Sequence, residues 1–243
     1  MTHYDAKLLS RRDVADGTTA FHFTWPHGFE FKAGQAVELL LPDPAGGDPV
    51  GHAFSLVNAP SEEELVVATR MRPSAYKRAL GAMPVGSDVR LDGPFGSLTL
   101  HRNPSRAAVF IAGGIGITPF MSMLRQAARD ATGHRIALVY SNRRRQDAAF
   151  LDELEGLAKS WPDFSLVTTM TEEGGAFVDA AMIRAATPGL SAPVFYVAGP
   201  PAMVEAMRAT LEKAGIEDVD VRSEEFFGYE TALKDEAHRA QAA

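Results

Sequence analysis

Apolar and polar residues alternate in short runs up to about residue 100. Such runs occur at 18–25 (TTAFHFTW), 36–41 (AVELLL), 52–57 (HAFSLV), 64–70 (ELVVATR) and 88–91 (DVRL). Turn-forming stretches separate them, such as PDPAGGDP at 42–49 and LGAMPVG at 80–86, and SAYKRAL at 74–80 predicts one helix. Short alternating strands between Gly- and Pro-rich turns predict an antiparallel β-barrel.

After residue 105 the pattern becomes one of apolar strands that lead into amphipathic helices. The strands are predicted at 107–113, 135–141 and 193–199, and the helices that follow them at 119–130, 147–159 and 201–215. This alternation predicts an α/β doubly wound parallel sheet with helices on both faces. We therefore expect a barrel domain over 1–102, an α/β domain over 103–232, and a polar C-terminal tail over 233–243 that forms a short helix or lacks fixed structure.

Composition narrows the classes of function. The formal charge of −7 argues against a nucleic-acid-binding surface, and the absence of cysteine excludes disulfides and any cysteine-held zinc or iron–sulfur site in this chain. The seven histidines show no metal-binding spacing, so no metal site is predicted. The sequence contains neither an apolar run of signal-peptide length at its start nor a stretch long enough to span a membrane, so we expect a cytoplasmic protein.

The sharpest local motif is FIAGGIGITPFMSML at 110–124, in which an apolar strand runs directly into a glycine-rich turn. Gly114 and Gly116 allow a tight turn and close approach of a ligand, and Thr118 stands where a helix begins. The free N–H groups of a helix start favour a phosphate. Tight turns without a ligand look similar, but the surrounding strand–helix rhythm favours nucleotide binding.

Two further turns should face the same crevice, because ligands of open α/β sheets bind at the carboxyl ends of the strands. The second strand ends in Ser141, and Arg143 and Arg144 follow with no acid before Asp147. That pattern favours NADP(H) over NAD(H), although a solvated basic turn is the alternative. In the third turn, YVAGPPAMV at 196–204, the candidate contacts are Gly199, Pro200 and Met203, and the last of these also fits a core position.

The order of the motifs resembles that of the ferredoxin–NADP reductase superfamily. HAFS at 52–55, TRMRPSAYKRAL at 69–80, GPFGSLTL at 93–100, AGGIGITP at 112–119, AGPPAM at 198–203 and EEFFGY at 224–229 follow its layout over about residues 5–230. The resemblance implies a flavin-binding barrel joined to an NAD(P)-binding domain. It also implies hydride transfer between NAD(P)H and a flavin, with FAD favoured over FMN.

The segment His52-Ala53-Phe54-Ser55 is similar to the family's flavin motif of Arg, any residue, Tyr or Phe, and Ser or Thr. The resemblance implies that Phe54 packs on the flavin and that Ser55 offers its hydroxyl near the flavin N5 atom. Side-chain alternation puts Ser55 opposite Phe54, so the strand has to end or bulge there. The departure is His52, which at pH 7 is mostly neutral, whereas arginine is a permanent cation.

Phosphate binding must therefore rely on other groups. Ser74 and the backbone N–H groups that follow it mark a helix start, and Arg70 or Arg72 supplies a cation. A capped helix with solvated arginines is the alternative reading. The flavin-binding candidates in this segment are Thr69, Arg70, Met71, Ser74 and Ala75.

The C-terminal motif resembles the segment that brings a carboxylate and an aromatic ring to the flavin. Glu225 is the expected proton donor and Phe227 the expected stacking ring, with Phe226 and Tyr229 as alternatives. Ala198 stands where the family often has a cysteine facing the nicotinamide, and hydride transfer does not require that thiol.

These expectations give three hypotheses for function. The first is an NAD(P)H-dependent flavoprotein reductase that passes electrons singly to a separate carrier, such as a ferredoxin, a flavodoxin or an oxygenase component. The second is a flavin or quinone reductase that acts on a diffusible small molecule. The third is a non-catalytic flavin- or nucleotide-binding module.

Overall fold

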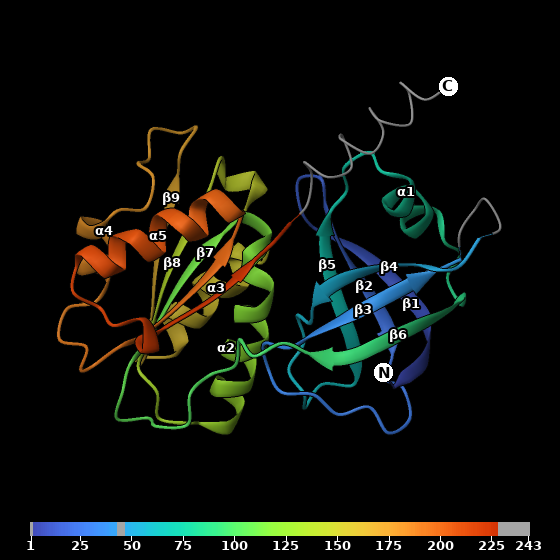
Figure 1. The fold of residues 1–243 in the computed structure, drawn as a ribbon, viewed down its shortest axis with the longest axis horizontal. Coiled ribbons are helices and arrows are strands. Elements are labelled where there is room, and N and C mark those ends of the chain that lie inside the picture. The colour runs from blue at the N-terminus through green and yellow to red at the C-terminus, as the bar shows by residue number, and fades with distance from the viewer. Residues whose placement is uncertain (1, 43–46, 228–243) are drawn as a thin grey trace.

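Two β-sheets, one antiparallel and one parallel, make up the framework of the chain (Figure 1). The structure is a computed structural model, and it describes residues 2–42 and 47–227. The antiparallel sheet comes first in the chain and the parallel sheet second, as the blue-to-red colouring of Figure 1 shows. This confirms the predicted pairing of an antiparallel β-domain with a doubly wound α/β domain.

The antiparallel sheet has six strands in the order β4-β3-β6-β1-β2-β5. Its edge strands β4 and β5 meet through one isolated bridge between Leu56 and Val67, so the sheet curls into a barrel without closing fully. Phe21, Phe23 and Leu39 lie fully buried inside it. The bounds are β1 His3–Ala15, β2 Thr18–Thr24, β3 Ala36–Leu41, β4 Val50–Ser55, β5 Glu64–Arg70 and β6 Asp88–Phe95, with helix α1 at Ala75–Ala82.

Strand β1 has no counterpart among the strands expected from the sequence, although it pairs with both β2 and β6. Its sequence, HYDAKLLSRRDVA, is dense in charge, and only its inward positions Ala6 and Leu8 are buried. A strand at the barrel surface needs apolar residues on one face alone, so it contains no continuous apolar run. The prediction relied on apolar runs and missed it for this reason.

The parallel sheet has five strands in the order β11-β10-β7-β8-β9. Its strands β7, β8 and β10 match the predicted ones, whereas β9, β11 and the short helix α4 had no counterpart in the prediction. Helices α2 and α3 share one apolar core with one face of the sheet, and α4 and α5 share another with the opposite face. The bounds are β7 Ala108–Gly113, β8 Ile136–Asn142, β9 Phe164–Met170, β10 Val194–Gly199, β11 Val221–Glu225, α2 Thr118–Asp130, α3 Leu151–Ser160, α4 Ala180–Ala186 and α5 Pro201–Lys213.

Helix α2 joins the two sheets. The Ser122 hydroxyl donates to the Asn58 carbonyl at 2.6 Å and accepts from the Gly34 N–H at 3.3 Å, so this buried side chain ties α2 to two barrel loops. Arg125 of the same helix reaches the Val57 carbonyl and the Glu62 carboxylate of the barrel half, each at 3.5 Å. These contacts hold α2, and with it the parallel sheet, against the barrel.

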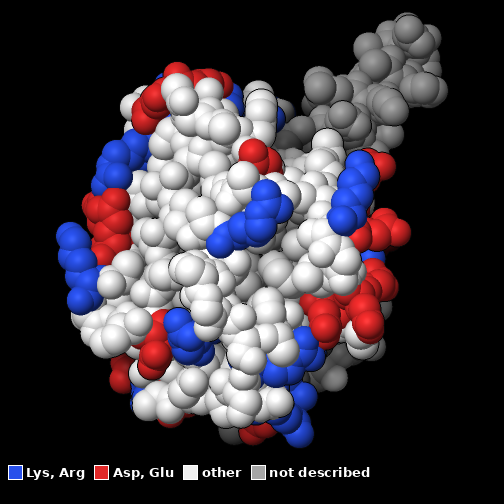
Figure 2. Space-filling model, turned by 90° about the vertical axis from the view of Figure 1, so that its left-hand side faces the viewer, with Lys and Arg blue, Asp and Glu red and all other residues white. Residues whose placement is uncertain are grey.

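Figure 2 shows the face of the α/β half, on which uncharged residues form most of the surface and Lys, Arg, Asp and Glu lie mainly towards its rim. Within the described ranges, every helix is too short or too polar to cross a bilayer.

Candidate functional site

The glycine-rich turn after β7 is packed against the turn after β10. A single 3₁₀ turn, Gly114–Ile117, connects β7 to α2, and Gly114 has a left-handed φ of 55°. A Cβ added to Gly116 would lie 2.5 Å from the Ala198 carbonyl carbon and 2.7 Å from the Gly199 nitrogen. Only glycine fits this contact, so the two turns lie backbone against backbone.

The two helices that leave this edge begin without a side-chain cap among the described residues. Helix α2 continues the 3₁₀ turn, so the Thr118 N–H donates to the Ile115 carbonyl, as the Thr118 hydroxyl does at 3.0 Å, and Pro119 has no N–H. Helix α5 begins with Pro201, which has no N–H, and the Met203 N–H donates to the Pro200 carbonyl at 2.9 Å. The two helix starts therefore offer few N–H groups to an anion such as a phosphate.

Met203 lies beneath the two turns. The thioether sulfur is 3.2 Å from where a Cβ of Gly199 would stand, and it is nearer still to the equivalent position at Gly113. The rest of the side chain packs against the apolar core on the α5 face. Of the two interpretations that the sequence left open for Met203, the core position matches these contacts.

The end of β8 adds a residue that the sequence interpretation did not include. Asn142 is 5% exposed, and among the described residues neither polar atom of its amide finds a hydrogen bond of good geometry. The Asn142 amide lies close enough to the Tyr140 hydroxyl to lower the pKa of that tyrosine, which burial raises. The Tyr140 hydroxyl itself donates towards the carbonyls of Gly114 and Ala149 at 3.2 Å. A buried amide without partners is unfavourable, and a ligand at this edge would satisfy it.

The arginines after β8 differ in their partners. Arg144 binds both carboxylate oxygens of the buried Asp147, at 3.1 and 2.8 Å, and this hydrogen bonding lowers the pKa of Asp147. Arg143 has a side chain 55% exposed and approaches Asp147 and Glu172 only at 3.8 and 3.9 Å. Arg144 therefore has a structural partner, and Arg143 is the more available cation beside Ser141.

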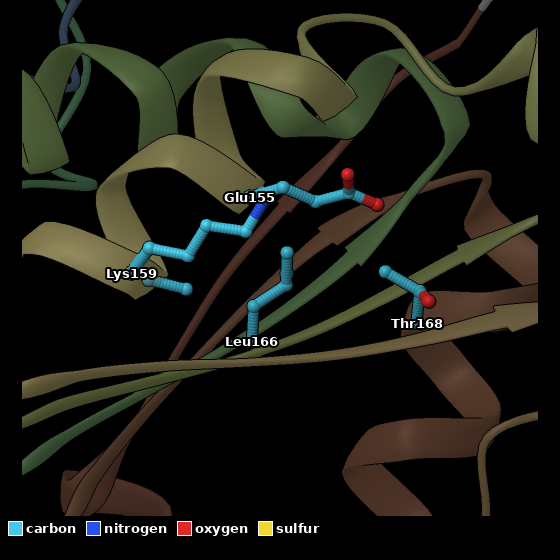
Figure 3. Close-up of a pocket in the computed structure, with 5 residues that line it drawn as sticks. Glu155, Lys159, Leu166 and Thr168 are labelled. Carbon is cyan, nitrogen blue, oxygen red and sulfur yellow. The ribbon is translucent and has the colours of Figure 1, made fainter.

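A separate hollow lies between α3 and the edge strand β9, away from the glycine turns (Figure 3). Glu155 and Lys159 of α3 face Leu166 and Thr168 of β9 across it, and its volume is about 270 Å³. That is below the roughly 300–1,000 Å³ of typical ligand clefts. Glu155 is also bound to Arg145 at 2.8 Å.

In the described part of the chain, no cluster of His, Asp and Glu side chains offers a metal site.

On the barrel side, β4 presents its two faces differently. His52 and Phe54 point to the side of α1, where the His52 ring lies 4.1 Å from the Tyr76 ring and the Phe54 ring 6.2 Å from it. Phe54 is buried in the barrel core, whereas Ala53 is exposed on the other face. The strand ends at Ser55, as the flavin motif requires.

Ser55 links the barrel to the C-terminal strand. Its hydroxyl lies 3.3 Å from the Glu224 carboxylate, whose pKa is raised by burial. The structure thus places Glu224, and not the predicted Glu225, against Ser55, because β11 pairs with β10 in a register that turns Glu225 outward. In Figure 1 the red segment after β11 runs towards the barrel.

The aromatic ring nearest the turns also belongs to the residue one position before the predicted one. The Phe226 N–H donates to the Gly199 carbonyl at 3.0 Å, and its ring packs against the shared core, whereas Phe227 is 76% exposed. Phe226, the alternative to Phe227 in the sequence motif, therefore lies nearer to the turns. Tyr229 and the predicted tail over 233–243 lie outside the described residues.

Side chains from the end of β5 to the start of α1 lie on both sides of the chain. Ser74 caps α1 by accepting from the Lys77 N–H at 3.2 Å, and Thr69 is buried. Arg70 instead reaches across to the α/β half, where its guanidinium lies 3.3 Å from where a Cβ of Gly114 would stand and 3.5 Å from the Asp147 carbonyl. Met71 and Ala75 flank these groups, the first half-buried and the second exposed.

This geometry defines a class of protein in which an antiparallel β-barrel stands beside a doubly wound domain of the kind that binds nucleotides. The family model described as oxidoreductase NAD-binding domain matches residues 110–209. Ferredoxin–NADP reductase B of Sorangium cellulosum is 30% identical over 175 residues, which cover 70% of this chain and 71% of that protein. The chain belongs to the ferredoxin–NADP reductase family.

Other relatives are longer than this chain. The reductase component of propane 2-monooxygenase from Mycolicibacterium goodii is 30% identical over 200 residues, 77% of this chain and 56% of that protein. The chain thus spans about half the length of such curated relatives. Among solved structures, the ferredoxin NADP⁺ reductase of Neisseria gonorrhoeae shares the fold, with a TM-score of 0.80 over 93% of this chain and 100% of that chain at 22% identity.

Proposed function

We propose that the protein is an NAD(P)H-dependent flavoprotein reductase that binds FAD and passes electrons singly to a separate carrier protein. The observation that carries the proposal is the Ser55–Glu224 contact at 3.3 Å. It joins the flavin motif of the barrel to the end of β11, directly beside Gly199 and the glycine turn. A bound flavin supplies the chemistry that accepts a hydride and releases single electrons.

The residues present fit a dinucleotide at the α/β edge. Gly116 and Gly199 pack so closely that side chains are excluded from the two turns, which lets a ligand approach their backbone. Arg70 adds a cation from the barrel, and the buried Asn142 adds an amide. We assign the nicotinamide nucleotide to this edge, with its pyrophosphate near Gly114.

The residues of the barrel fit a flavin as well. The exposed Ala53, the Ser55 hydroxyl and the capped start of α1 follow one another along the barrel. In this assignment the Ser55 hydroxyl would help to hold the flavin ring, and the Glu224 carboxyl group beside it would hold a proton at that end of the site. The raised pKa of Glu224 supports that role, because a carboxyl that keeps its proton nearer neutral pH is a better acid there. Phe226 is our candidate for the aromatic neighbour.

NADP(H) is the preferred coenzyme in this proposal. Arg143 stands at the end of β8 beside Ser141, where a 2′-phosphate of the adenosine ribose is expected. Its weak ion-pair distances of 3.8 and 3.9 Å leave the guanidinium able to turn to a phosphate. Arg144 supports the turn through Asp147. The Neisseria structure carries FAD and NADP, which agrees with this choice.

The electron acceptor is a separate protein in this proposal. The chain has no cysteine and so cannot hold an iron–sulfur cluster through thiolates. Longer relatives, of which the matched part is 56% and 59%, are named as the reductase component of a propane 2-monooxygenase and as the electron transfer component of a dioxygenase. A ferredoxin, a flavodoxin or an oxygenase component would take the electrons. The cytoplasmic location expected from the sequence remains a prediction.

The test is reduction of a protein carrier by the FAD-loaded protein with NADPH. We expect ferredoxin or flavodoxin to be reduced much faster than free flavin or a quinone at equal concentration. Turnover with free flavin or quinone alone, with no rate gain from any carrier, would instead identify a reductase of small molecules. A protein that binds flavin but oxidises neither NADPH nor NADH would be a non-catalytic binding module.

A further inference from the structure

Tyr140 is a tyrosine near the carboxyl end of β8 to which the proposed function gives no role. Its side chain is fully buried, and the hydroxyl donates towards two carbonyls, those of Gly114 and Ala149, each at 3.2 Å. Burial raises the pKa of Tyr140, so the hydroxyl keeps its proton at neutral pH. Because a hydroxyl has a single proton to donate, Tyr140 shares it between the two carbonyls.

The two carbonyls belong to different segments of the site. Gly114 starts the 3₁₀ turn between β7 and α2, whereas Ala149 lies in the loop that connects β8 to α3. In the proposed function the first segment receives the pyrophosphate of the coenzyme, and the second receives the 2′-phosphate through Arg143. The Tyr140 hydroxyl therefore bridges the two segments that we assign to the coenzyme.

Both hydrogen bonds act on peptide groups beside left-handed residues. Gly114 has a φ of 55°, and Phe150, which follows Ala149, has a φ of 61°. A left-handed conformation is unfavourable for a residue with a side chain, so the structure around Phe150 has to maintain it. Because a trans peptide is planar, a carbonyl held against Tyr140 directs the N–H of the next residue the opposite way. The hydroxyl thus sets the orientation of one peptide group in each segment.

The barrel reinforces the same bridge through Arg70. The Arg70 guanidinium lies 3.3 Å from where a Cβ of Gly114 would stand, and it donates to the Asp147 carbonyl of the loop at 3.5 Å. It is also close enough to the Tyr140 hydroxyl to lower the pKa of that group against the effect of burial. One cation of the barrel and one buried hydroxyl of the sheet thus converge where the Gly114 turn meets the loop.

We propose that Tyr140 is a positioning residue for the nicotinamide coenzyme, whose hydroxyl holds the Gly114 turn and the loop after β8 in the relative position that binds the coenzyme. The proposal rests on the proposed function, since it assumes that the coenzyme lies across these two segments. Tyr140 is buried and acts only through the backbone. Its hydroxyl therefore contributes to coenzyme binding and leaves the transfer of the hydride to the cofactors.

The test is Tyr140→Phe in the FAD-loaded protein, with oxidation of NADPH and of NADH measured against ferricyanide as the electron acceptor. The variant removes the hydroxyl and keeps the ring in the apolar core. Loss of the shared hydrogen bond should raise KM for both coenzymes by about 2- to 10-fold. The kcat values should stay within about twofold of the wild type, because the lost interaction serves binding alone.

Tyr196→Phe is the matched control. Tyr196 is also fully buried, in β10 of the same sheet, but its hydroxyl accepts from the His101 N–H at 2.9 Å and has no contact with the Gly114 turn. Both variants should lower Tm by about 2–4 °C, since each loses a buried hydrogen bond. Only Tyr140→Phe should change KM, and a purely structural role of the hydroxyl would not produce that difference.

A ligand that engages one segment alone gives a second readout. Adenosine 2′-monophosphate carries the 2′-phosphate and lacks the pyrophosphate, so it does not span the bridge. Tyr140→Phe should weaken inhibition by NADP⁺ and leave inhibition by adenosine 2′-monophosphate near the wild-type value. Equal weakening of both inhibitors would confine the hydroxyl to the loop and overturn the proposed bridge.

The outcomes separate the two proposals. A wild-type protein that loads FAD but oxidises neither coenzyme contradicts the proposed function itself. A wild type that oxidises them while Tyr140→Phe loses stability and keeps both KM values overturns the assignment of Tyr140 alone. A rise in KM for NADPH without one for NADH also overturns it, since the bridge serves the part that the two coenzymes share.

Discussion

Replacement of Gly116 by alanine tests the packing of the two ligand-binding turns. The added Cβ would stand 2.5 Å from the Ala198 carbonyl carbon and 2.7 Å from the Gly199 nitrogen, and both neighbours are backbone atoms that cannot rotate away. Real contacts of this kind start above 3.0 Å, so the turns must separate. Overpacking of this kind costs about 1–3 kcal/mol, and for a chain of this size each kcal/mol lowers Tm by about 2–4 °C.

The assay combines thermal unfolding with coenzyme kinetics. Gly116→Ala should lower Tm and raise KM for NADPH, since displacement of the turns moves the backbone near Gly114 to which we assign the pyrophosphate, whereas FAD affinity at the barrel should be retained. Gly156→Ala is the matched control, because Gly156 lies in α3 with nothing within 4 Å of its added Cβ. It should be stabilised by roughly 0.5–1 kcal/mol. Unchanged Tm and KM in Gly116→Ala would refute the described contact.

Three further predictions concern two side chains of the site and, at the opposite end of the parallel sheet, the His101 and His134 rings, whose centroids lie 4.8 Å apart. Arg143→Ala should raise KM for NADPH by about 10- to 100-fold and leave that for NADH unchanged, and equal effects on both would remove the case for a 2′-phosphate contact. Glu224→Gln should slow turnover by about 10²-fold with Glu225→Gln near wild type, and the reverse ranking would return the role to Glu225. Burial lowers the pKa of His101 and of His134, so the unfolded chain binds more protons than the folded one at acidic pH. The free energy of unfolding should therefore fall as pH drops below about 6.5, and His101→Gln should reduce this pH dependence in urea unfolding measured from pH 8 to 5.

The fold was predictable where the hydrophobic pattern was strong. Strands β7, β8 and β10 are almost continuously apolar because both of their faces are covered, and their pattern indicated the doubly wound sheet. Strands β1, β9 and β11 have mixed patterns with charged or exposed positions, and periodicity alone missed them. Their places depend on pairing with partners distant in the sequence.

The motifs predicted which segments form the site, but they did not predict which side chain of each segment points into it. The glycine turns and the end of β4 at Ser55 agree with expectation. The sequence left the carboxylate open, since EEFFGY offers two neighbouring acids, and only the pairing of β11 with β10 turns Glu224 inward. Arg70 was grouped with the flavin contacts, yet its side chain crosses to Gly114. Long side chains reach partners that strand alternation does not reveal.

The burial of Lys77 illustrates a second limit of sequence reasoning. In SAYKRAL the lysine resembles any solvated helix residue next to Arg78. Its burial follows from the way α1 packs across the end of the barrel, with the Tyr76 hydroxyl donating to the Leu39 carbonyl at 2.7 Å. Such packing depends on contacts between residues that are distant in the sequence.

The most direct test of the account is anaerobic mixing of the FAD-loaded protein with NADPH while the visible absorption of the flavin is followed. The account predicts rapid loss of that absorption, because the turns of the α/β half and Ser55 of the barrel bring the two cofactors together. It further predicts slower loss with NADH at the same concentration. Flavin that stays oxidised with both coenzymes would contradict the central claim.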